Sequence, residues 1–386
     1  MKHFDLALIG FGAATMSLAV RLAARYPGRI AIIEPRQLPS DDRTWCGWRL
    51  VDHPFVDQAT QIWTRWAVSH GGREIIRGSD QTPYEMLRAS AVQAQALDVI
   101  GTRQDWSLFA GSALQAAERH DSAWSLTLDS GETLTATRVM DSRPPALALD
   151  RPWVWQSFVG RELTGPGLAG ESPVRLMDFV DDTTPLLTFV YELPIGPGHR
   201  LIELTRFAPQ RPSLSELGGQ LDRILADRGL AAHTVVREES SHLPMAPIPS
   251  YDQEGWMRVG TAGGSMRPAT GYTFHDIQRW ADVCAEALVA GQAPRAPSRR
   301  SLMDWLDGVF LESLWRHRPV GAAGEPFVRL FDRTPPESMA RFLMSRPQLA
   351  DIGHILRALP PTPMLKAAMR HSCRRNRGVR IDSPTG

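Results

Sequence analysis

Glu203 lies in the run Leu-Ile-Glu-Leu-Thr, where most of its neighbours along the chain are apolar. A carboxyl group in apolar surroundings keeps its proton near neutral pH, so it can act as a general acid. In a β-strand, Glu203 would share one face with Leu201 and Thr205, while Ile202 and Leu204 would point to the other face. Two interpretations therefore stay open: a buried proton donor with Thr205 beside it, or a solvent-facing strand residue.

A glycine turn near the N-terminus has the pattern of a dinucleotide-binding site. Gly10 and Gly12 lie between a short apolar stretch, which predicts a strand, and residues rich in Ala and Leu, which predict a helix. Gly10 permits a tight turn, Gly12 lets the backbone approach a pyrophosphate, and the N-terminus of the helix attracts its charge. Thr15 takes the third glycine position, and Glu34 follows about twenty residues after Gly12, where a carboxylate binds a ribose. The residues predicted to contact the cofactor here are Gly10, Gly12, Ala13, Ala14 and Glu34.

A second glycine-rich segment spans residues 259–272 and follows a short apolar run. Glycines at this density let the backbone pass close to a planar ligand. In flavin hydroxylases the equivalent strand ends in Gly-Asp, whose acid binds the ribityl chain, whereas this chain has Thr261 there. At both glycine segments the alternative is a turn without a ligand. The residues predicted to contact the cofactor in this segment are Gly260, Thr261, Gly263, Gly264, Thr270, Gly271 and Tyr272.

Other polar residues are secondary candidates. Asp178 is a candidate for catalysis or for the wall of a pocket. Arg143 lies two residues after Asp141 at the end of a predicted strand, so we expect an ion pair between them, with flavin contact as the alternative for Arg143. His242 and His275 have no partner at metal-ligand spacing, and we predict no metal site.

The tryptophan content is high, at 12 residues. Trp45, Trp153 and Trp155 are candidates to line a channel for a hydrophobic substrate or to stabilise a cation. The alternative for each is an ordinary core residue.

The elements that must position these residues predict an α/β (α+β) fold. Strands at 4–9 and 29–33 flank a helix at 13–25, which makes a Rossmann-type βαβ unit. We also predict a loop over 36–60 and a helix over Pro83–Gln95. Two extended runs joined by Gly196-Pro197-Gly198, a hairpin over 122–139 and a helix over 213–229 complete the middle of the chain.

The predicted elements divide the chain into three structural units. The βαβ spacing does not separate NAD from FAD, and its N-terminal position favours FAD by analogy. The units are an FAD-binding domain of residues 1–65, 84–145 and 250–295, a mainly β substrate-binding domain of residues 66–83 and 146–249, and a helical C-terminal region of residues 296–386.

Composition narrows the function classes. Lys+Arg (43) and Asp+Glu (42) nearly cancel over the 386 residues, which gives no argument for nucleic acid. Three cysteines without a framework favour a reducing, cytoplasmic compartment. The chain has no apolar run of about 20 residues, so we expect no membrane span and no export signal.

Several short segments, taken in order along the chain, resemble the bacterial lycopene β-cyclase family, flavoproteins of carotenoid biosynthesis. The LIELT run is similar to the family's Leu-Glu-x-Thr motif, which implies that Glu203 is its essential glutamate; Leu204 replaces a second acid of some relatives. The PATGY segment discriminates most, because flavin hydroxylases lack it. The matching segments are GFGAA, DDRTWCGW, MDSRPP, WQSFVGREL, RLMDFV, LIELT, HLPM, GTAGGSMRPATGYTF and MDWLDGVFL.

The resemblance implies an isomerase that closes the linear ends of lycopene, or of a related linear carotenoid, into β-rings without net oxidation. It implies reduced FAD as a cofactor that is not consumed and NADPH as the upstream reductant. A carotene dissolves in lipid, so we expect peripheral contact with a membrane surface. Apolar Met364, Leu365 and Met369 beside Lys366 and Arg370, with further arginines such as Arg375 and Arg377, fit such contact; a solvated tail is the alternative.

Three other functions stay open from the sequence. A flavin monooxygenase or halogenase is disfavoured by Thr261. It is also disfavoured by Gln156-Ser157-Phe158, which breaks a WxWxIP motif begun at Trp153 and Trp155. The others are a cyclase or reductase of another isoprenoid, and a carotenoid-binding protein without catalysis. The sequence predicts no oligomeric state.

Overall fold

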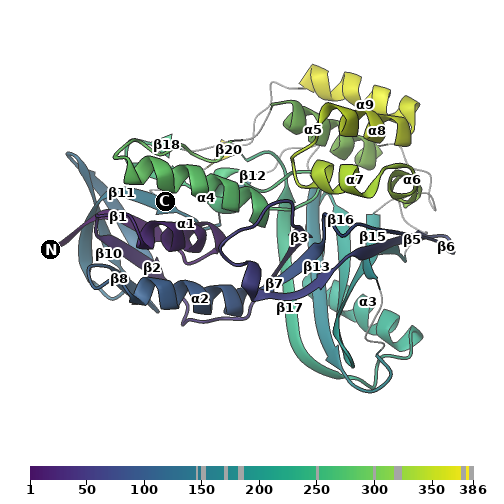
Figure 1. The fold of residues 1–386 in the computed structure, drawn as a ribbon, viewed down its shortest axis with the longest axis horizontal. Helices are drawn as coiled ribbons and strands as arrows, with labels where there is room; N and C mark the ends of the chain where they lie inside the picture. The colour runs from purple at the N-terminus through teal and green to yellow at the C-terminus, as the bar shows by residue number, and fades with distance from the viewer. Residues whose placement is uncertain are drawn as a thin grey trace.

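The computed structural model describes residues 1–144, 147–148, 154–168, 173–180, 187–248, 252–298, 301–316, 324–374 and 380–381. Over these residues the chain forms two lobes side by side, one built on an 8-stranded mixed sheet near the N-terminus and the other on a 7-stranded sheet with helices above and below it (Figure 1). Both lobes contain helices and strands, which confirms the predicted α/β class.

The first lobe is built around β1 (Lys2–Ile9), which pairs in parallel with β2 (Ile30–Glu34) and β11 (Thr133–Asp141). Helix α1 (Ala13–Ala23) connects β1 to β2, so the predicted βαβ unit is confirmed. Leu6–Ile9 of β1 and Ile30–Ile33 of β2 are apolar and buried because this part of the sheet is covered on both faces. The sheet also contains β8 (Ser107–Ala110), β9 (Leu114–His120), β10 (Ala123–Leu128), β18 (Asp252–Gln253) and β19 (Trp256–Arg258).

Helices and a hairpin cover the two faces of this sheet. Leu6 and Leu8 of β1 pack with α1, α2 (Ala89–Gly101) and α4 (Phe274–Val289). On the other face Phe4 packs against Trp124 and Leu126 of the β10–β11 hairpin, which the sequence predicts. This packing on both faces fixes the strand ends that carry the glycine turns at one edge of the sheet.

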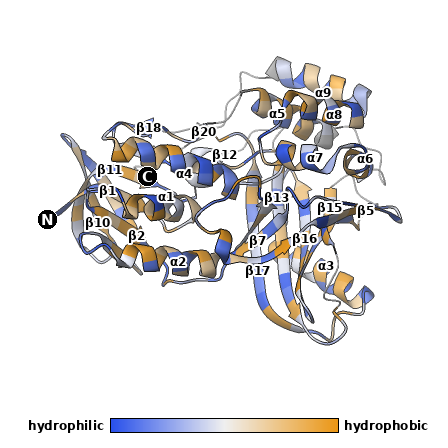
Figure 2. Ribbon diagram, in the orientation of Figure 1, coloured by the Kyte–Doolittle hydropathy of each residue, from blue (hydrophilic) through white to orange (hydrophobic). Residues whose placement is uncertain are grey.

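The second lobe is a sheet in the order β17-β13-β16-β15-β14-β5-β6. Helix α3 (Leu214–Asp227) packs on one face through Leu217 and Leu221, and its N-cap Ser213 accepts the Glu216 N–H. Figure 2 shows orange, hydrophobic positions alternating with blue ones along these strands. The strands are β5 (Arg65–His70), β6 (Arg73–Gly78), β13 (Val154–Thr164), β14 (Val174–Phe179), β15 (Leu187–Gly196), β16 (His199–Ala208) and β17 (Thr234–Met245).

The C-terminal helices cover the opposite face of the second sheet (Figure 1). Phe327 and Phe331 of α6 pack there against strand residues such as Val68 and Phe179. The predicted helical C-terminal character is confirmed over the described residues, which exclude Arg375 and Arg377. The helices are α5 (Ser301–Arg316), α6 (Glu325–Arg333), α7 (Pro336–Leu343), α8 (Leu349–Ala358) and α9 (Pro361–Arg374).

A small sheet lies between the lobes, and two of its strands differ from what the sequence predicts. Residues 36–60, predicted as a loop, contain β3 (Thr44–Trp48), and the predicted helix over Pro83–Gln95 begins as β7 (Tyr84–Arg88) before α2 starts. Pairing of β7 with both β3 and β4 (Ala59–Trp63) overrides the helix propensity of its Glu, Met and Leu residues. The remaining short elements are η1 (Val56–Gln58), η2 (Gly260–Gly263), β12 (Leu147–Ala148) and β20 (Arg380–Ile381).

No helix in the described part of the chain is long and apolar enough to span a membrane.

Candidate active site

A cavity of about 1650 Å³ extends between the two lobes. Its wall begins at Gly10 and Gly12 of the first lobe, includes Glu203 on β16, and ends at apolar residues of α8 and α9 such as Leu356 and Leu365. Most of its wall is apolar in character, with a polar end at the glycine turn. A long hydrophobic molecule and a dinucleotide can therefore occupy opposite ends of one space.

The first glycine turn is shaped by contacts that a side chain would destroy. Gly10 has φ +82°, and a Cβ there would lie 2.6 Å from Ser142 Oγ. A Cβ on Gly12 would meet nothing closer than Ser142 Oγ at 3.7 Å, so Gly12 borders open space. Thr15, in the third glycine position, donates from Oγ1 to the carbonyls of Gly10 (2.6 Å) and Gly12 (3.1 Å). The threonine thus supports the turn.

Glu34 also holds this turn. Its carboxylate accepts the Phe11 N–H at 2.6 Å and the Arg36 Nε–H at 2.7 Å, and the residue is 2% exposed. Burial acts to raise the pKa of Glu34, but the hydrogen bonds from Arg36 and Phe11 outweigh it and leave the pKa lowered. Arg36, which the sequence analysis missed, lines the cavity and also pairs with Asp42 at 2.5 Å.

The second glycine segment divides into a cavity-lining part and a packing part. Gly260 (φ +66°) and Gly271 (φ +75°) line the cavity, together with Thr261, Thr270 and Tyr272. Gly263 and Gly264, predicted as cofactor contacts, do not line it. A Cβ on Gly263 would collide with the Arg258 carbonyl oxygen, and one on Gly264 would lie 2.5 Å from the Ile248 carbonyl oxygen. Close backbone packing explains both glycines, and their prediction is corrected.

Glu203 is buried at the centre of the second sheet, with 8% of its surface exposed. It lies opposite Tyr191 of β15 on one side and Gly160 of β13 on the other. Thr205 Oγ1 donates a hydrogen bond of 2.7 Å to Glu203 Oε1. The solvent-facing interpretation is therefore wrong, because the C-terminal helices cover this face of the sheet.

A second carboxylate, Glu239 of β17, lies beside Glu203. Gly160 pairs with both residues, so the two glutamates flank a position without a side chain. Burial first, and then the charge of Glu239, raise the pKa of Glu203 to about 8. The hydrogen bond from Thr205 and the charge of Arg237 act in the opposite direction without cancelling this rise. Glu203 therefore carries its proton at neutral pH.

Aromatic side chains surround the acid. The Tyr84 hydroxyl lies 2.9 Å from that of Tyr191 and 3.3 Å from that of Tyr272, and all three line the cavity. Burial raises the pKa of each of these phenols. Trp48 packs edge-on against Tyr84 with ring centroids 4.7 Å apart, and Trp45 stacks on a phenylalanine of α4. Their electron-rich faces suit a cationic intermediate.

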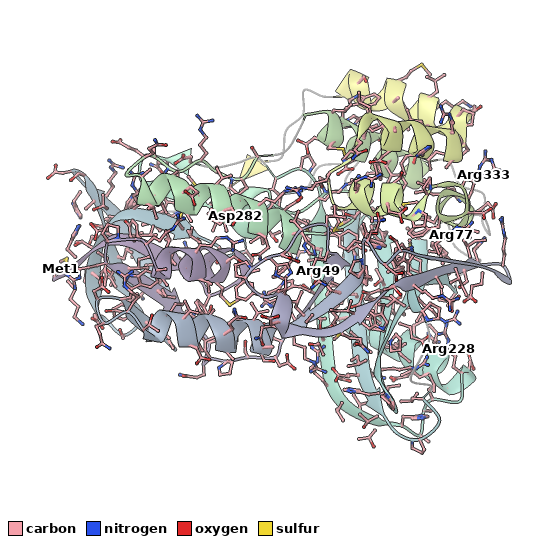
Figure 3. The ribbon with its side chains drawn as sticks, viewed as in Figure 1. Met1, Arg49, Arg77, Arg228, Asp282 and Arg333 are labelled. Carbon is pink, nitrogen blue, oxygen red and sulfur yellow. The ribbon has the colours of Figure 1, made fainter. Side chains whose placement is uncertain are left out.

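Asp178, predicted as a catalytic or pocket residue, has a different environment. Its carboxylate accepts hydrogen bonds of 2.5 Å from Ser69 Oγ and from Arg228 Nη2. Arg228 lies beside α3 on the outer side of the sheet (Figure 3). Asp178 is not among the described residues that line the cavity, so its position supports an ion pair instead of the predicted role.

Other predictions have mixed outcomes. Arg143 and Asp141 form the expected ion pair, with Nη2 and Oδ2 at 3.0 Å, and Arg143 also lines the cavity. Trp45 and Trp155 line the cavity, and the guanidinium carbon of Arg211 lies 4.0 Å from the centroid of the Trp155 ring. Trp153 lies outside the described residues.

The two histidines differ in their surroundings. His242 lines the cavity and lies 2.7 Å from Ser157 Oγ. His275 lies with His53 and Glu85 in a buried group whose ligand-type atoms are within 4.8 Å of one another, which the spacing did not predict. Burial lowers the pKa of His275 to about 3. Arg49, labelled between the lobes in Figure 3, places a guanidinium 3.6 Å from Glu85, so this carboxylate already faces a cation.

Comparisons with known proteins identify the family of this chain. The family model described as lycopene cyclase protein matches residues 5–369. The chain belongs to the lycopene cyclase family. A lycopene beta-cyclase from Pantoea ananas is 25% identical over 381 residues, covering 95% of this chain and 97% of that protein. One from Pseudescherichia vulneris is 27% identical over 396 residues, with the same coverage of both chains.

Several solved structures have a fold similar to that of this lycopene cyclase family member. A geranylgeranyl bacteriochlorophyll reductase-like protein from Thermoplasma acidophilum has a TM-score of 0.67, with 14% identity over 96% of this chain and 100% of that one. A p-nitrophenol 4-monooxygenase from Pseudomonas putida has a TM-score of 0.62, with 14% identity over 96% and 98%. These similarities confirm the predicted fold, which is shared by enzymes with different names.

The raised pKa of Glu203 predicts a pH-dependent stability effect. The folded protein keeps this proton up to about pH 8, whereas an unperturbed glutamate releases it near pH 4.5. Between these values the folded state binds more protons than the unfolded state, so this group lowers the free energy of unfolding as pH rises. We expect the melting temperature of Glu203→Gln, relative to the unmodified chain, to increase from pH 5 to pH 9.

The matched control is Glu238→Gln, the adjacent acid of β17, which pairs with Arg161 on the outer side of the sheet. Its melting temperature should follow that of the unmodified chain without a pH-dependent difference. Parallel curves for Glu203→Gln and the unmodified chain would show that Glu203 ionises normally.

Proposed function

We propose that this chain is a lycopene β-cyclase that converts linear ends of lycopene, or of a related linear carotenoid, to β-rings. The observation that carries the proposal is a buried Glu203, whose pKa burial raises, in the wall of a long apolar cavity. The named relatives support the carotenoid substrate, and their coverage of nearly the whole chain favours this activity over an oxygenase of the same fold.

Ring closure needs a proton, a dry pocket and stabilisation of a cation. Glu203 transfers its proton to the terminal double bond, and the neighbouring internal double bond attacks the resulting tertiary cation. The ring cation then loses a proton to the Glu203 carboxylate left by the first step. This forms the cyclohexene double bond, restores the acid and leaves the mass of the carotenoid unchanged. Tyr191, Tyr84 and Trp45 present aromatic rings to this part of the cavity, and the rings stabilise positive charge while they exclude water. Thr205 orients the carboxyl group through its hydrogen bond.

The residues at the polar end fit a flavin dinucleotide. Gly10 and Gly12 leave space that a Cβ would fill or border, and the N-terminus of α1 has no side-chain cap. Its free N–H groups and its dipole suit a pyrophosphate. When bound, reduced FAD supplies an electron-rich, negatively charged ring that stabilises positive charge. We propose that it is held by Gly10, Gly12, Ala13, Ala14, Glu34, Arg36, Arg143, Gly260, Thr261, Thr270, Gly271 and Tyr272.

The family resemblance also suggests NADPH as the electron donor for this flavin. Reduction of the purified flavoprotein by NADPH, followed as bleaching of the flavin absorbance under anaerobic conditions, tests this assignment. Dithionite reduction is the positive control.

Glu203→Gln should abolish cyclisation, because glutamine keeps the shape of the protonated acid but cannot donate its proton to carbon. The assay is conversion of lycopene by the reduced holoenzyme. The products are separated by chromatography, and their masses are measured by mass spectrometry. In the unmodified enzyme the rate should fall about tenfold per pH unit above pH 8, where Glu203 ionises. Glu238→Gln should retain activity. Cyclic products of unchanged mass from Glu203→Gln would remove this residue from the mechanism.

Gly12→Ala should weaken FAD binding without unfolding the chain. Gly12 has φ −89° and ψ 179°, which alanine adopts, and its Cβ would enter only the space proposed for the pyrophosphate. A steric cost of about 1–3 kcal/mol corresponds to a loss of affinity of roughly fivefold to over a hundredfold. Flavin fluorescence quenching measures the dissociation constant. The control is Gly101→Ala, where a Cβ meets nothing within 4 Å, and equal affinity of the two variants would exclude Gly12 from the site.

We further propose that the apolar end of the cavity docks on an anionic bilayer. Leu356, Leu365 and Met369 line the cavity and are also exposed, and Leu349 is exposed beside them at the start of α8. Lys366 and Arg370 lie on α9 between these apolar residues. A lipid-dissolved substrate could then enter the cavity without crossing water.

Leu365→Glu should reduce binding to vesicles that contain phosphatidylserine, since it places a charge in the proposed contact. Co-flotation with the vesicles measures the bound fraction, and we expect a several-fold decrease. Val283→Glu is the matched control, because Val283 on α4 and Leu365 are both 64% exposed. Equal flotation of the two variants would locate the membrane contact elsewhere or exclude it.

A further inference from the structure

We propose that Glu239 is a positioning residue of the acid site, a second carboxylate whose place beside Glu203 opposes loss of the proton from that acid. This inference rests on the proposed function and adds to it a second acid that no family motif identified. Glu239 is not the proton donor. It acts through Glu203, because a fixed negative charge beside a second carboxyl group opposes loss of that group's proton.

The geometry places the two carboxyl groups together. Glu203 and Glu239 are the neighbours of Gly160 on adjacent strands, and both line the cavity. A Cβ on Gly160 would lie 3.2 Å from Glu239 Cγ and 3.4 Å from Glu203 Cβ. The absent side chain is thus the space over which the two glutamates approach each other. Gly160 lies in the middle of a strand, where glycine is disfavoured without such a reason.

The Glu239 carboxyl group is contacted by two donors. Arg237 Nη1 lies 2.8 Å from Glu239 Oε2, and Thr44 Oγ1 donates to the same oxygen at 2.9 Å. Thr44 in turn accepts from Arg237 Nη2 at 2.8 Å, so its hydroxyl hydrogen is directed to Glu239. An ion pair and a hydrogen bond both favour the charged form of a carboxyl group.

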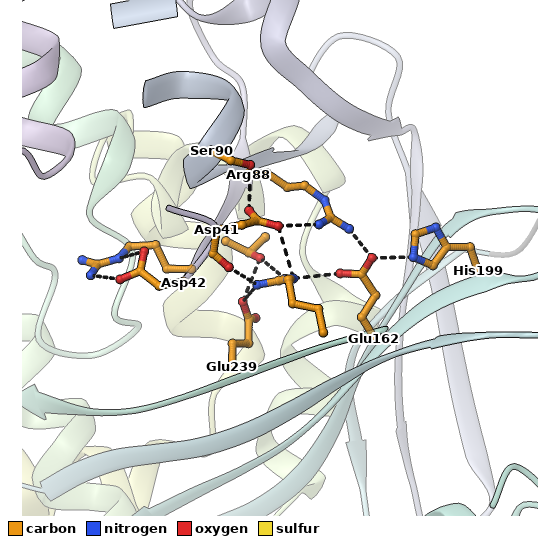
Figure 4. A network of polar contacts seen from close by, with 10 residues as sticks. Asp41, Asp42, Arg88, Ser90, Glu162, His199 and Glu239 are labelled. Atoms are coloured by element: carbon orange, nitrogen blue, oxygen red, sulfur yellow. Dashed lines mark hydrogen bonds and ion pairs between the residues drawn. The ribbon is translucent and has the colours of Figure 1, made fainter. Parts of the chain in front are cut away.

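The same network limits how strongly Arg237 acts on Glu203. Arg237 Nε lies 2.8 Å from Glu162, whose carboxylate also pairs with Arg88 and His199. Figure 4 shows these contacts, with Glu239 on one side of the network and Glu162 on the other. The negative charges of Glu162 and Glu239 therefore offset part of the effect of Arg237, which acts to lower the pKa of Glu203.

The phenol and thiol groups around Glu203 carry no charge at neutral pH. Tyr191 faces it from β15, Cys46 from β3, and Tyr84 and Tyr272 complete the surrounding cluster. Burial raises the pKa of all four groups. Glu85, one residue along β7 from Tyr84, is engaged by His53 at 2.8 Å. The charges next to Glu203 are thus those of Glu239 and Arg237.

The decisive variant is Glu239→Gln, which removes the charge and keeps the shape. The alkaline limit of the rate–pH profile reports ionisation of Glu203, and we expect it to move to lower pH by about one unit or more. A merely structural role would lower the melting temperature or the rate at all pH values without moving this limit. Glu238→Gln is the matched control and should leave the profile unchanged.

Two further variants keep the test decisive if Glu239→Gln folds poorly. Glu239→Asp retains the charge, so its alkaline limit should stay near that of the unmodified enzyme even if its rate is lower. Arg237→Met should move the limit to higher pH, and Glu162 would keep its partners Arg88 and His199. Shifts in opposite directions for the acid and the arginine are the expected result; equal limits in all variants would overturn the proposal.

A readout without catalysis separates this inference from the proposed function. Infrared difference spectra of the unmodified chain minus Glu203→Gln isolate the C=O stretch of the protonated Glu203 carboxyl, and its loss with pH gives the titration midpoint. The same titration in the Glu239→Gln background should show a lower midpoint. An unmodified enzyme that closes no rings would end the proposed function and leave this midpoint measurable, whereas an unchanged midpoint in an active enzyme would end the inference alone.

Discussion

A carboxyl group that protonates a hydrocarbon must hold its proton at neutral pH and yet sit where water cannot compete for it. In the mechanism proposed for this chain, the requirement is met by burial of Glu203 under the C-terminal helices and by a second carboxylate that faces it across Gly160. Arg237 and Thr44 contact that second carboxylate, and Glu162 also pairs with the arginine. Three adjacent strands and β3 are needed to build this arrangement, so the acid site depends on the whole sheet.

The cavity changes in character from one end to the other. At the first lobe it is bordered by glycine turns, a helix N-terminus and Arg36, and at the other end by the apolar residues of α8 and α9. Glu203 lies between these ends. A charged dinucleotide and a hydrocarbon can thus reach the acid from opposite sides, and neither has to pass through surroundings of the wrong polarity. The two lobes are joined by β3 and β7, whose residues also line the space between them.

Much of this arrangement could be predicted from the sequence because its signals are local. The βαβ unit follows from an apolar strand, two glycines and a helix in immediate succession, and Glu203 follows from one short motif. The ion pair of Asp141 with Arg143 needs only two residues of separation. Where local propensity conflicted with pairing, as in Tyr84–Arg88, the prediction failed, since the partners β3 and β4 come from elsewhere in the chain.

Glu239 could not be found in this way because its role depends on strand order. In the sequence Arg237-Glu238-Glu239 it is one of two adjacent acids, and alternation along β17 places Glu238 outside and Glu239 inside. Which of the two meets Glu203 is decided by the register of β13 with both β16 and β17, and β13 precedes them by dozens of residues. A slip of one residue in either pairing would bring Glu238 to the cavity or turn Glu203 out of it. Gly160 is the residue that both registers share, and the proton chemistry of the site therefore depends on a position that carries no functional group.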